Sequence, residues 1–262
     1  MKLPAERVVA ASKAWPWIPD TAVTAETDDY LIVRFPDYFG HPLVLTRFTP
    51  AGPVPDAVEA ALARARGYGL PRLWWMVRLD SPPGVPELLE GRGATVDATL
   101  DVLARDIGYG VPELPPPAVS AELRWATDPA TVRDGQELGT KVFGGPAAPD
   151  DHIASEARRA EKDVPAGAGG TVVAYAGGTP VACGGVIVAA DGVALLWRGA
   201  VAEQARGRGL YRAVLSARLE YAVRHGATMA LVKGRIETSG PVLRRAGFEA
   251  YGQERIYAVP LG

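Results

Sequence analysis

Two glycines and two arginines stand just before a strongly helical stretch and could together form an anion site. They are Arg206, Gly207, Arg208 and Gly209, and an apolar run, VALLWRGAV, precedes them. This order predicts a strand that leads through the glycines into a helix. The first N–H groups of a helix lack partners and lie at the positive end of its dipole, and arginines donate charged hydrogen bonds to phosphate oxygens. We therefore expect a phosphate to bind here, with an ordinary glycine turn as the alternative.

Two common phosphate motifs are excluded by the residues around this loop. The chain has no GxxxxGK[ST] stretch, so it is not a P-loop protein. Leu210, Tyr211 and Arg212 follow Gly209, so the third glycine of a dinucleotide fingerprint is missing. The loop must therefore hold its phosphate in another way.

The loop and its surroundings resemble the GNAT superfamily of N-acyltransferases. The stretch from Gln204 to Gly209 matches the Q/R-x-x-G-x-G/A loop of that family, and SGPVLRRAGF resembles the short helix ending in Gly-Phe that closes the GNAT motif. The resemblance covers about Ala121 to Leu261. It implies that acetyl-CoA is the co-substrate, with its pantetheine arm along the end of the strand and its pyrophosphate on the loop N–H groups.

The resemblance also implies which residues bind acetyl-CoA. They are Ala200, Val201, Ala202, Gln204, Ala205, Arg206, Gly207, Arg208, Gly209, Leu210 and Tyr211. For Tyr211, packing of a half-buried ring on the sheet is an equally good alternative. No metal is expected, because three scattered histidines and one cysteine form no ligand cluster.

Amine acylation needs a neutral amine, stabilisation of the tetrahedral oxyanion and a proton for the departing thiolate. A backbone N–H near Val201 could serve the oxyanion. Glu203 is the candidate base, with Glu237 and plain solvated carboxylates as alternatives. The family's usual acid is a tyrosine at the position of Leu243, and leucine cannot donate a proton. Ser239 is the candidate acid in its place, with another tyrosine, water or the absence of acyl transfer as alternatives. We expect an N-acetyltransferase acting on a primary amine; the alternative is a catalytically silent acyl-CoA-binding regulatory or scaffold protein.

A proline-dense segment, GVPELPPPAVS, separates two regions with the same order of predicted helix, strand, short helix and strand. We predict an α/β (α+β) protein with two GNAT-like domains, each a mixed, mostly antiparallel sheet flanked by helices. Residues 1–112 form a degenerate copy without a CoA loop, residues 113–119 a linker, and residues 120–262 the acyl-CoA-binding domain. The matching helix of the first copy is entered through FTPAGPVP, where prolines remove N–H donors, so one CoA per chain is expected.

The composition of the chain favours some classes of partner and excludes others. The 28 basic and 30 acidic residues nearly balance, which argues against nucleic-acid binding. Cys183 is the single cysteine, so no intramolecular disulfide can form, and we expect it to be buried and structural. Its isolation favours a reducing, cytoplasmic setting. No apolar run is long enough for a membrane span. The expected partner is a small-molecule or peptide amine acceptor, and the protein a monomer or homodimer. Four aromatics could wall the acceptor cleft or fill the first core: Trp15, Trp17, Tyr38 and Phe39.

Overall fold

The computed structural model describes residues 2–14 and 18–262, so Trp15 and Trp17 lie outside the described residues. The chain divides into two compact units. Unit 1 consists of Met1–Pro4, Leu103–Lys233 and Val242–Ala250, and unit 2 of Ala5–Val102, Gly234–Pro241 and Tyr251–Gly262. Neither unit is one continuous stretch of sequence, and the division at a linker over residues 113–119 stays a prediction.

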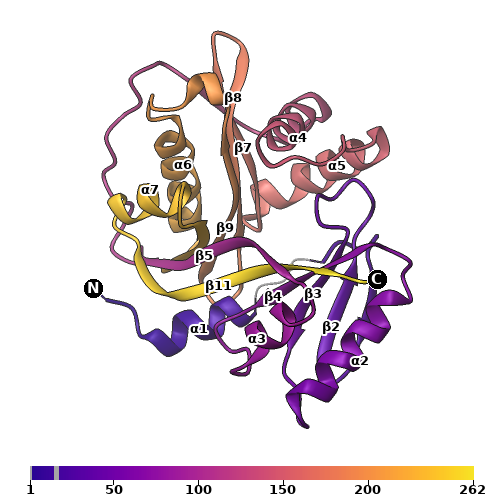
Figure 1. The fold of residues 1–262 in the computed structure, drawn as a ribbon. Helices are drawn as coiled ribbons and strands as arrows, with labels where there is room; N and C mark the ends of the chain where they lie inside the picture. Colours follow the sequence, from indigo (N-terminus) through magenta and orange to yellow (C-terminus); the bar gives the residue numbers. More distant parts are fainter. Residues whose placement is uncertain (1, 15–17) are drawn as a thin grey trace. The chain divides into compact units, whose positions relative to one another are not determined.

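The described residues contain both helices and strands in each part of the chain (Figure 1). The first part holds α1 Ala5–Lys13, β1 Val23–Glu26, β2 Tyr30–Arg34, β3 Leu43–Phe48, α2 Val54–Arg66, β4 Arg72–Val77, α3 Val85–Glu90 and β5 Thr95–Asp106. The second holds β6 Glu122–Trp125, α4 Pro129–Phe143, α5 Asp150–Ala166, β7 Gly169–Ala176, β8 Thr179–Val188, β9 Val193–Val201, the short 3₁₀ helix η1 Glu203–Ala205, α6 Leu210–Arg224, β10 Met229–Arg235, α7 Ser239–Arg245 and β11 Glu249–Pro260.

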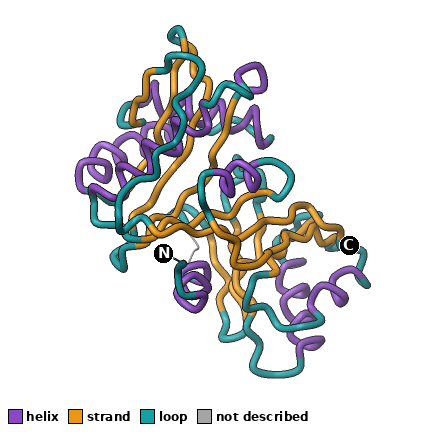
Figure 2. The backbone as a smooth tube through the Cα atoms, turned by 90° about the vertical axis from the view of Figure 1, so that its left-hand side faces the viewer, coloured by secondary structure: helices purple, strands orange, loops and turns teal. Residues whose placement is uncertain are grey.

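Unit 1 is built on a mixed sheet in which β6, β7, β8 and β9 are antiparallel neighbours and β10 runs parallel to β9. Helices α4 and α5 cover one face of this sheet and α6 covers the other (Figure 1), and the view turned by 90° shows the same strands beside their helices (Figure 2). The α4–α5 side buries Ile153 and Ala157, and the α6 side buries Leu215 and Leu219. Both faces of the central strands are therefore apolar, as continuous runs such as VALLW require.

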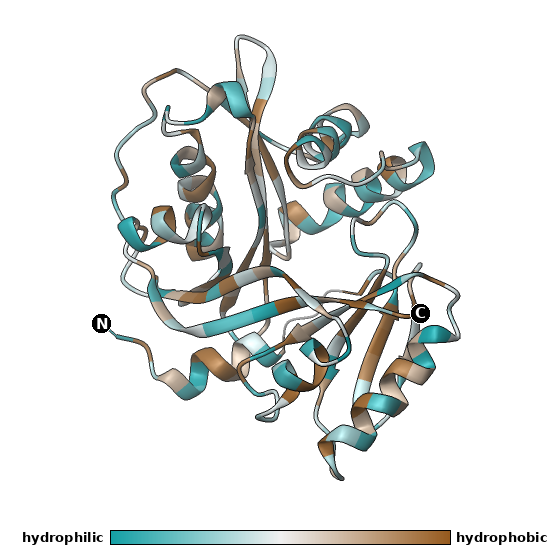
Figure 3. Cartoon of the chain, in the orientation of Figure 1, coloured by the Kyte–Doolittle hydropathy of each residue, from teal (hydrophilic) through white to brown (hydrophobic). Residues whose placement is uncertain are grey.

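The strands of unit 2 also pair in a mixed pattern. Strands β1, β2 and β3 are antiparallel neighbours, β4 is parallel to β3, and β11 is antiparallel to β4. Helix α2 buries Val58 and Leu62 in the core of this unit. Figure 3 shows brown, apolar strands and a mixture of brown and teal along α2, as expected for a helix with one buried face. Each unit thus contains a parallel strand pair joined by a helix, β3–α2–β4 in one and β9–α6–β10 in the other. The expected fold class is confirmed.

The last strand of the chain pairs with β4 of unit 2. Strand β11 pairs with β4 from Arg255 opposite Val77 to Pro260 opposite Arg72. Its Tyr257 is fully buried in the same apolar cluster as the residues of α2 and β4. Residues far apart in the sequence therefore share one core.

Most predicted elements are confirmed by the structure. The run RLWWMV is β4, and VALLWRGAV is β9. Asp128 is the N-cap of α4, as its position before the helix indicates. Ser239 is the first residue of α7.

Replacing Asp128 with alanine is expected to lower the free energy of unfolding by about 1 kcal/mol at pH 7, because the cap is lost. The carboxylate accepts the N–H groups of Ala130 and Thr131, both at 3.0 Å, and the hydroxyl of Thr131 at 2.7 Å. The backbone N–H of Thr131 contributes most to holding the pKa of Asp128 below its usual value of 3.8. Since the folded pKa is the lower one, this contribution is present above the unfolded pKa and disappears as pH falls through the folded value.

Urea unfolding of the wild type and the variant between pH 7 and pH 3 measures the effect. The matched control is Glu161→Ala, which removes an exposed carboxylate of α5. A wild-type advantage that grows on acidification would contradict the assigned cap.

Candidate functional site

The carboxyl end of β9 separates from its parallel neighbour. The ladder between β9 and β10 ends at Leu196 opposite Val232, whereas β9 continues to Val201. On the other side β9 remains tied to β8, and the N–H of Ala202 donates to the carbonyl of Val181 at 2.9 Å. Successive N–H groups of a strand point to opposite edges, so the N–H of Val201 is directed toward the separated edge. The splayed edge offers backbone groups to a ligand.

The glycine loop follows directly. Gly207 and Gly209 have φ of 76° and 81°, which glycine adopts without strain, and Gly209 is the N-cap of α6. Among the described residues, no acceptor is bonded to the N–H groups from Gly207 to Tyr211. A Cβ on Gly207 would meet nothing within 4 Å, whereas one on Gly209 would lie 2.9 Å from the Cα of Pro117. The loop therefore presents free N–H donors next to a helix N-terminus.

Positive charge surrounds these donors. Arg206 and Arg208 are exposed and form no ion pair within residues 2–14 and 18–262, and α6 has no acidic residue in its first turn. Arg212 lies in that turn and donates from Nε to the carbonyl of Pro115 at 3.3 Å, while the N–H of Ala118 donates to the carbonyl of Arg208 at 2.9 Å. Cations at the positive end of a helix dipole are unfavourable by themselves, and a bound anion would offset this cost. Free N–H groups and guanidinium groups together fit a pyrophosphate.

A β-bulge distorts β9 just before the splayed end. The pairing of β8 with β9 shifts register between Cys183 and Gly185, which leaves an additional residue in β9. Arg198 lies at this point with φ of 49°. It is the only residue other than glycine with a positive φ in the described part of the chain. The bulge redirects the strand at the place where the ligand edge begins.

The bulge is supported from the α6 side by a buried cation. Arg218 is 1% exposed and donates to the carbonyls of Val214 at 3.2 Å and Gly185 at 3.3 Å. Burial lowers its pKa below the usual value of 12.5. Its guanidinium carbon lies 6.0 Å from the ring centroid of Tyr211, and that ring fills the position where a side chain on Gly199 would be. Tyr211 therefore packs on the sheet, which agrees with the packing alternative.

The other expected CoA residues follow one another along this path. Ala200, Ala202 and Ala205 are buried, Gln204 is exposed and Leu210 is buried in the core. Small buried alanines leave the strand edge accessible, and Leu210 anchors the start of α6. Their contact with acetyl-CoA stays a prediction.

The expected catalytic side chains lie in different parts of the fold. Glu203 is exposed in η1, immediately after β9, and belongs to unit 1. Ser239 and the alternative base Glu237 belong to unit 2. Leu243 is fully buried in an apolar cluster with Phe248, which explains why a leucine is stable there. The roles of Glu203 and Ser239 stay predictions.

Cys183 is buried, and its Sγ lies 3.7 Å from the carbonyl oxygen of Gly135. Burial raises the pKa of this thiol to about 11, so it is not a nucleophile at neutral pH. No group of three or more metal-ligating side chains occurs among residues 2–14 and 18–262. In the same residues, no helix has the length and apolar character of a membrane span.

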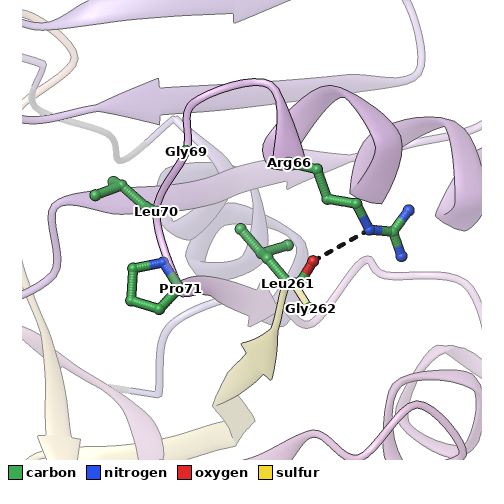
Figure 4. A pocket seen from close by; sticks show the side chains of 6 residues that line it. All are labelled: Arg66, Gly69, Leu70, Pro71, Leu261 and Gly262. Atoms are coloured by element: carbon green, nitrogen blue, oxygen red, sulfur yellow. Dashed lines mark hydrogen bonds between the residues drawn. The ribbon is translucent and has the colours of Figure 1, made fainter.

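A separate pocket of about 400 Å³ lies in unit 2 (Figure 4). Its lining residues are Arg66, Gly69, Leu70, Pro71, Leu261 and Gly262. The Nε of Arg66 donates to the carbonyl of Leu261 at 3.3 Å. These side chains include no carboxylate, imidazole or thiol, so the pocket offers no acid or base for catalysis.

Three arginines of this site were missed by sequence reasoning. Arg198 lies on the bulge, Arg212 in the first turn of α6, and Arg218 inside the core. Arg212 could have been found, since a basic residue in the first turn of a helix is unfavourable without an anion. The bulge depends on the pairing register between β8 and β9, and the burial of Arg218 on long-range packing, so neither has a local signal.

The segment that contains this site matches a known family. Residues 140–247 match the family model of the acetyltransferase (GNAT) family. The chain is similar to the solved structure of a GCN5-related N-acetyltransferase from Kribbella flavida, with a TM-score of 0.67 and 20% identity over 100% of this chain and 97% of that one. For a GCN5-related N-acetyltransferase from Sphaerobacter thermophilus the TM-score is 0.67 and the identity 17%, over 89% and 81%.

A tandem GNAT protein from the clavulanic acid biosynthesis pathway gives a TM-score of 0.61 and 18% identity over 97% of this chain and 88% of that one. At these identities the likeness concerns the fold. A comparison with the sequences of curated proteins finds no match. The segment 140–247 thus matches the GNAT acetyltransferase family by its sequence, and the chain that contains it has the fold of GCN5-related N-acetyltransferases.

Proposed function

We propose that the protein is an N-acetyltransferase that transfers an acetyl group from acetyl-CoA to a primary amine. One arrangement carries the proposal: a splayed strand end leads into a loop of free N–H donors and arginines at the start of a helix. The family match over residues 140–247 supports transfer from an acyl-CoA. A small molecule or peptide bearing the amine is the proposed acceptor.

In this proposal, different residues bind the co-substrate, stabilise the oxyanion and transfer protons. Acetyl-CoA supplies the activated acyl group when bound. The N–H groups from Gly207 to Tyr211, with Arg206 and Arg208, hold its pyrophosphate. The N–H of Val201 stabilises the oxyanion, because it is directed toward the open edge of β9. Glu203 takes the proton of the amine, directly or through water, and Ser239 returns a proton to the thiolate.

The matching helix of the other half offers no such site. Helix α2 follows Pro53, which forms no side-chain cap, and a second proline lies in its first turn. Prolines have no N–H, so few donors remain for a phosphate. We propose that this half is a degenerate GNAT copy with a structural role, which fits the likeness to a tandem GNAT protein.

The test is release of free thiol from acetyl-CoA by the full-length protein with a panel of primary amines. We expect release that depends on one class of amine, and mass spectrometry should find the acetylated product. Binding alone liberates no CoA. Tight acetyl-CoA binding with no turnover on any amine would instead favour the catalytically silent CoA-binding protein.

A further inference from the structure

The bulge in β9 places the side chain of Arg198 on the α4 side of the sheet. Cys183 faces α4, since its Sγ lies 3.7 Å from the carbonyl of Gly135, and its cross-strand partner Ala200 shares that face. Trp197 pairs with Gly185, two residues from Cys183, and so lies on the same face. In a regular strand the residue after Trp197 would point to the opposite, α6 face. The additional residue turns Arg198 toward α4 instead.

Contacts with α4 confirm this direction. The Nη1 of Arg198 donates to Oε1 of Gln136 at 2.6 Å. A Cβ on Gly139 would lie 2.6 Å from Nη2 of Arg198, so the guanidinium group occupies the space where α4 lacks a side chain. Gln136 and Gly139 thus orient the guanidinium group without neutralising it.

The charge of Arg198 is not compensated. No carboxylate lies within ion-pair distance of it anywhere in residues 2–14 and 18–262, and the side chain is solvent-accessible. Nearby His152 provides no negative charge, and burial is the main reason that its pKa lies below 6.5. The φ of 49° costs energy for any residue with a Cβ, and glycine would avoid that cost. Arg198 therefore presents an oriented, uncompensated cation, although its positive φ costs conformational energy.

We propose that Arg198 binds a carboxylate of the acceptor, so that the substrates are amines that also carry a carboxylate group. The inference rests on the proposed acetyl transfer. The loop donors and arginines bind the phosphates at the start of α6, whereas Arg198 faces α4 and precedes Val201 by three residues in the same strand. A carboxylate held by Arg198 leaves the amine of the same molecule within reach of an acyl group at Val201. Guanidinium and carboxylate match as paired donors and acceptors.

The experiment compares α-, β- and γ-amino acids with their primary amides as acceptors for the full-length protein. We expect kcat/KM to favour the free carboxylates by about 10- to 100-fold, the range for a hydrogen bond to a charged group. In Arg198→Gln this preference should vanish, while affinity for acetyl-CoA stays unchanged. Arg198→Gly should lose the preference too, although it relieves the positive φ, and Arg224→Gln at the exposed end of α6 is the charge-matched control.

Equal rates for acids and amides, or a preference that persists in Arg198→Gln, would overturn the proposal while leaving acetyl transfer intact. If no amine is acetylated, the proposed function fails separately. Calorimetry on the CoA-bound protein then decides about Arg198. Binding of the amino acids but not their amides, abolished in Arg198→Gln, supports the anion site, and absence of such binding refutes it.

Discussion

Replacing Gly207 with aspartate is expected to weaken acetyl-CoA binding by about 100-fold, while asparagine at the same position has little effect. Both side chains fit, since a Cβ on Gly207 meets nothing within 4 Å, and both residues tolerate the φ of 76° better than most. They differ only in charge. At an effective dielectric constant of about 20, two like charges about 5 Å apart repel by about 3 kcal/mol. A pyrophosphate on the loop N–H groups would experience this repulsion.

Isothermal titration of the full-length variants with acetyl-CoA measures the difference. The difference in acetyl-CoA affinity between the aspartate and asparagine variants should become smaller in high salt, because salt screens charges at an exposed loop. Equal affinities of the aspartate and asparagine variants for acetyl-CoA would show that the pyrophosphate does not bind at this loop. Wild-type titration should saturate at one CoA per chain. Saturation at two CoA per chain would instead place a second site elsewhere and contradict the proposed degenerate copy in the N-terminal half.

Gly207 was found from the sequence because its signal is local. A strand pattern, two glycines and a helical pattern lie within a few residues, and each depends on neighbours along the chain. The same holds for Asp128, whose type and position before a helix predict a cap. In β4, two tryptophans and a valine likewise favour a strand by local preference. These features are present in the structure because tertiary packing is compatible with the local preferences.

Features that depend on distant partners had no such signal. The positive φ of Arg198 arises from the register of β9 against β8, which no local pattern specifies. Arg218 is buried in α6 together with Leu210 and Val214, and only the carbonyls to which it donates explain the burial of a cation. The pairing of β11 with β4 joins strands that are far apart in the chain. Its RIYAV pattern predicts a strand, not a partner.

Replacing Tyr257 with alanine is expected to lower the free energy of unfolding of unit 2 by roughly 3–5 kcal/mol, as truncation of a large aromatic side chain in a core does. Tyr257 is fully buried on β11, lies opposite Trp75 of β4, and donates its hydroxyl to Glu90 at 3.0 Å. Tyr257→Phe is the matched control. It keeps the ring and removes only one hydrogen bond to an exposed carboxylate, so we expect a loss of about 1 kcal/mol.

Tryptophan fluorescence during urea unfolding should report both variants, because Trp75 lies in the same core and its ring centroid is 4.9 Å from that of Phe48. The difference in free energy of unfolding between the alanine and phenylalanine variants measures the contribution of the packed ring. A large gap means that the last strand stabilises a core composed mainly of Ala5–Val102. A gap below about 1 kcal/mol would mean that β11 adds little to this core. The N-terminal half would then be stable without the end of the chain, against the pairing of β11 with β4.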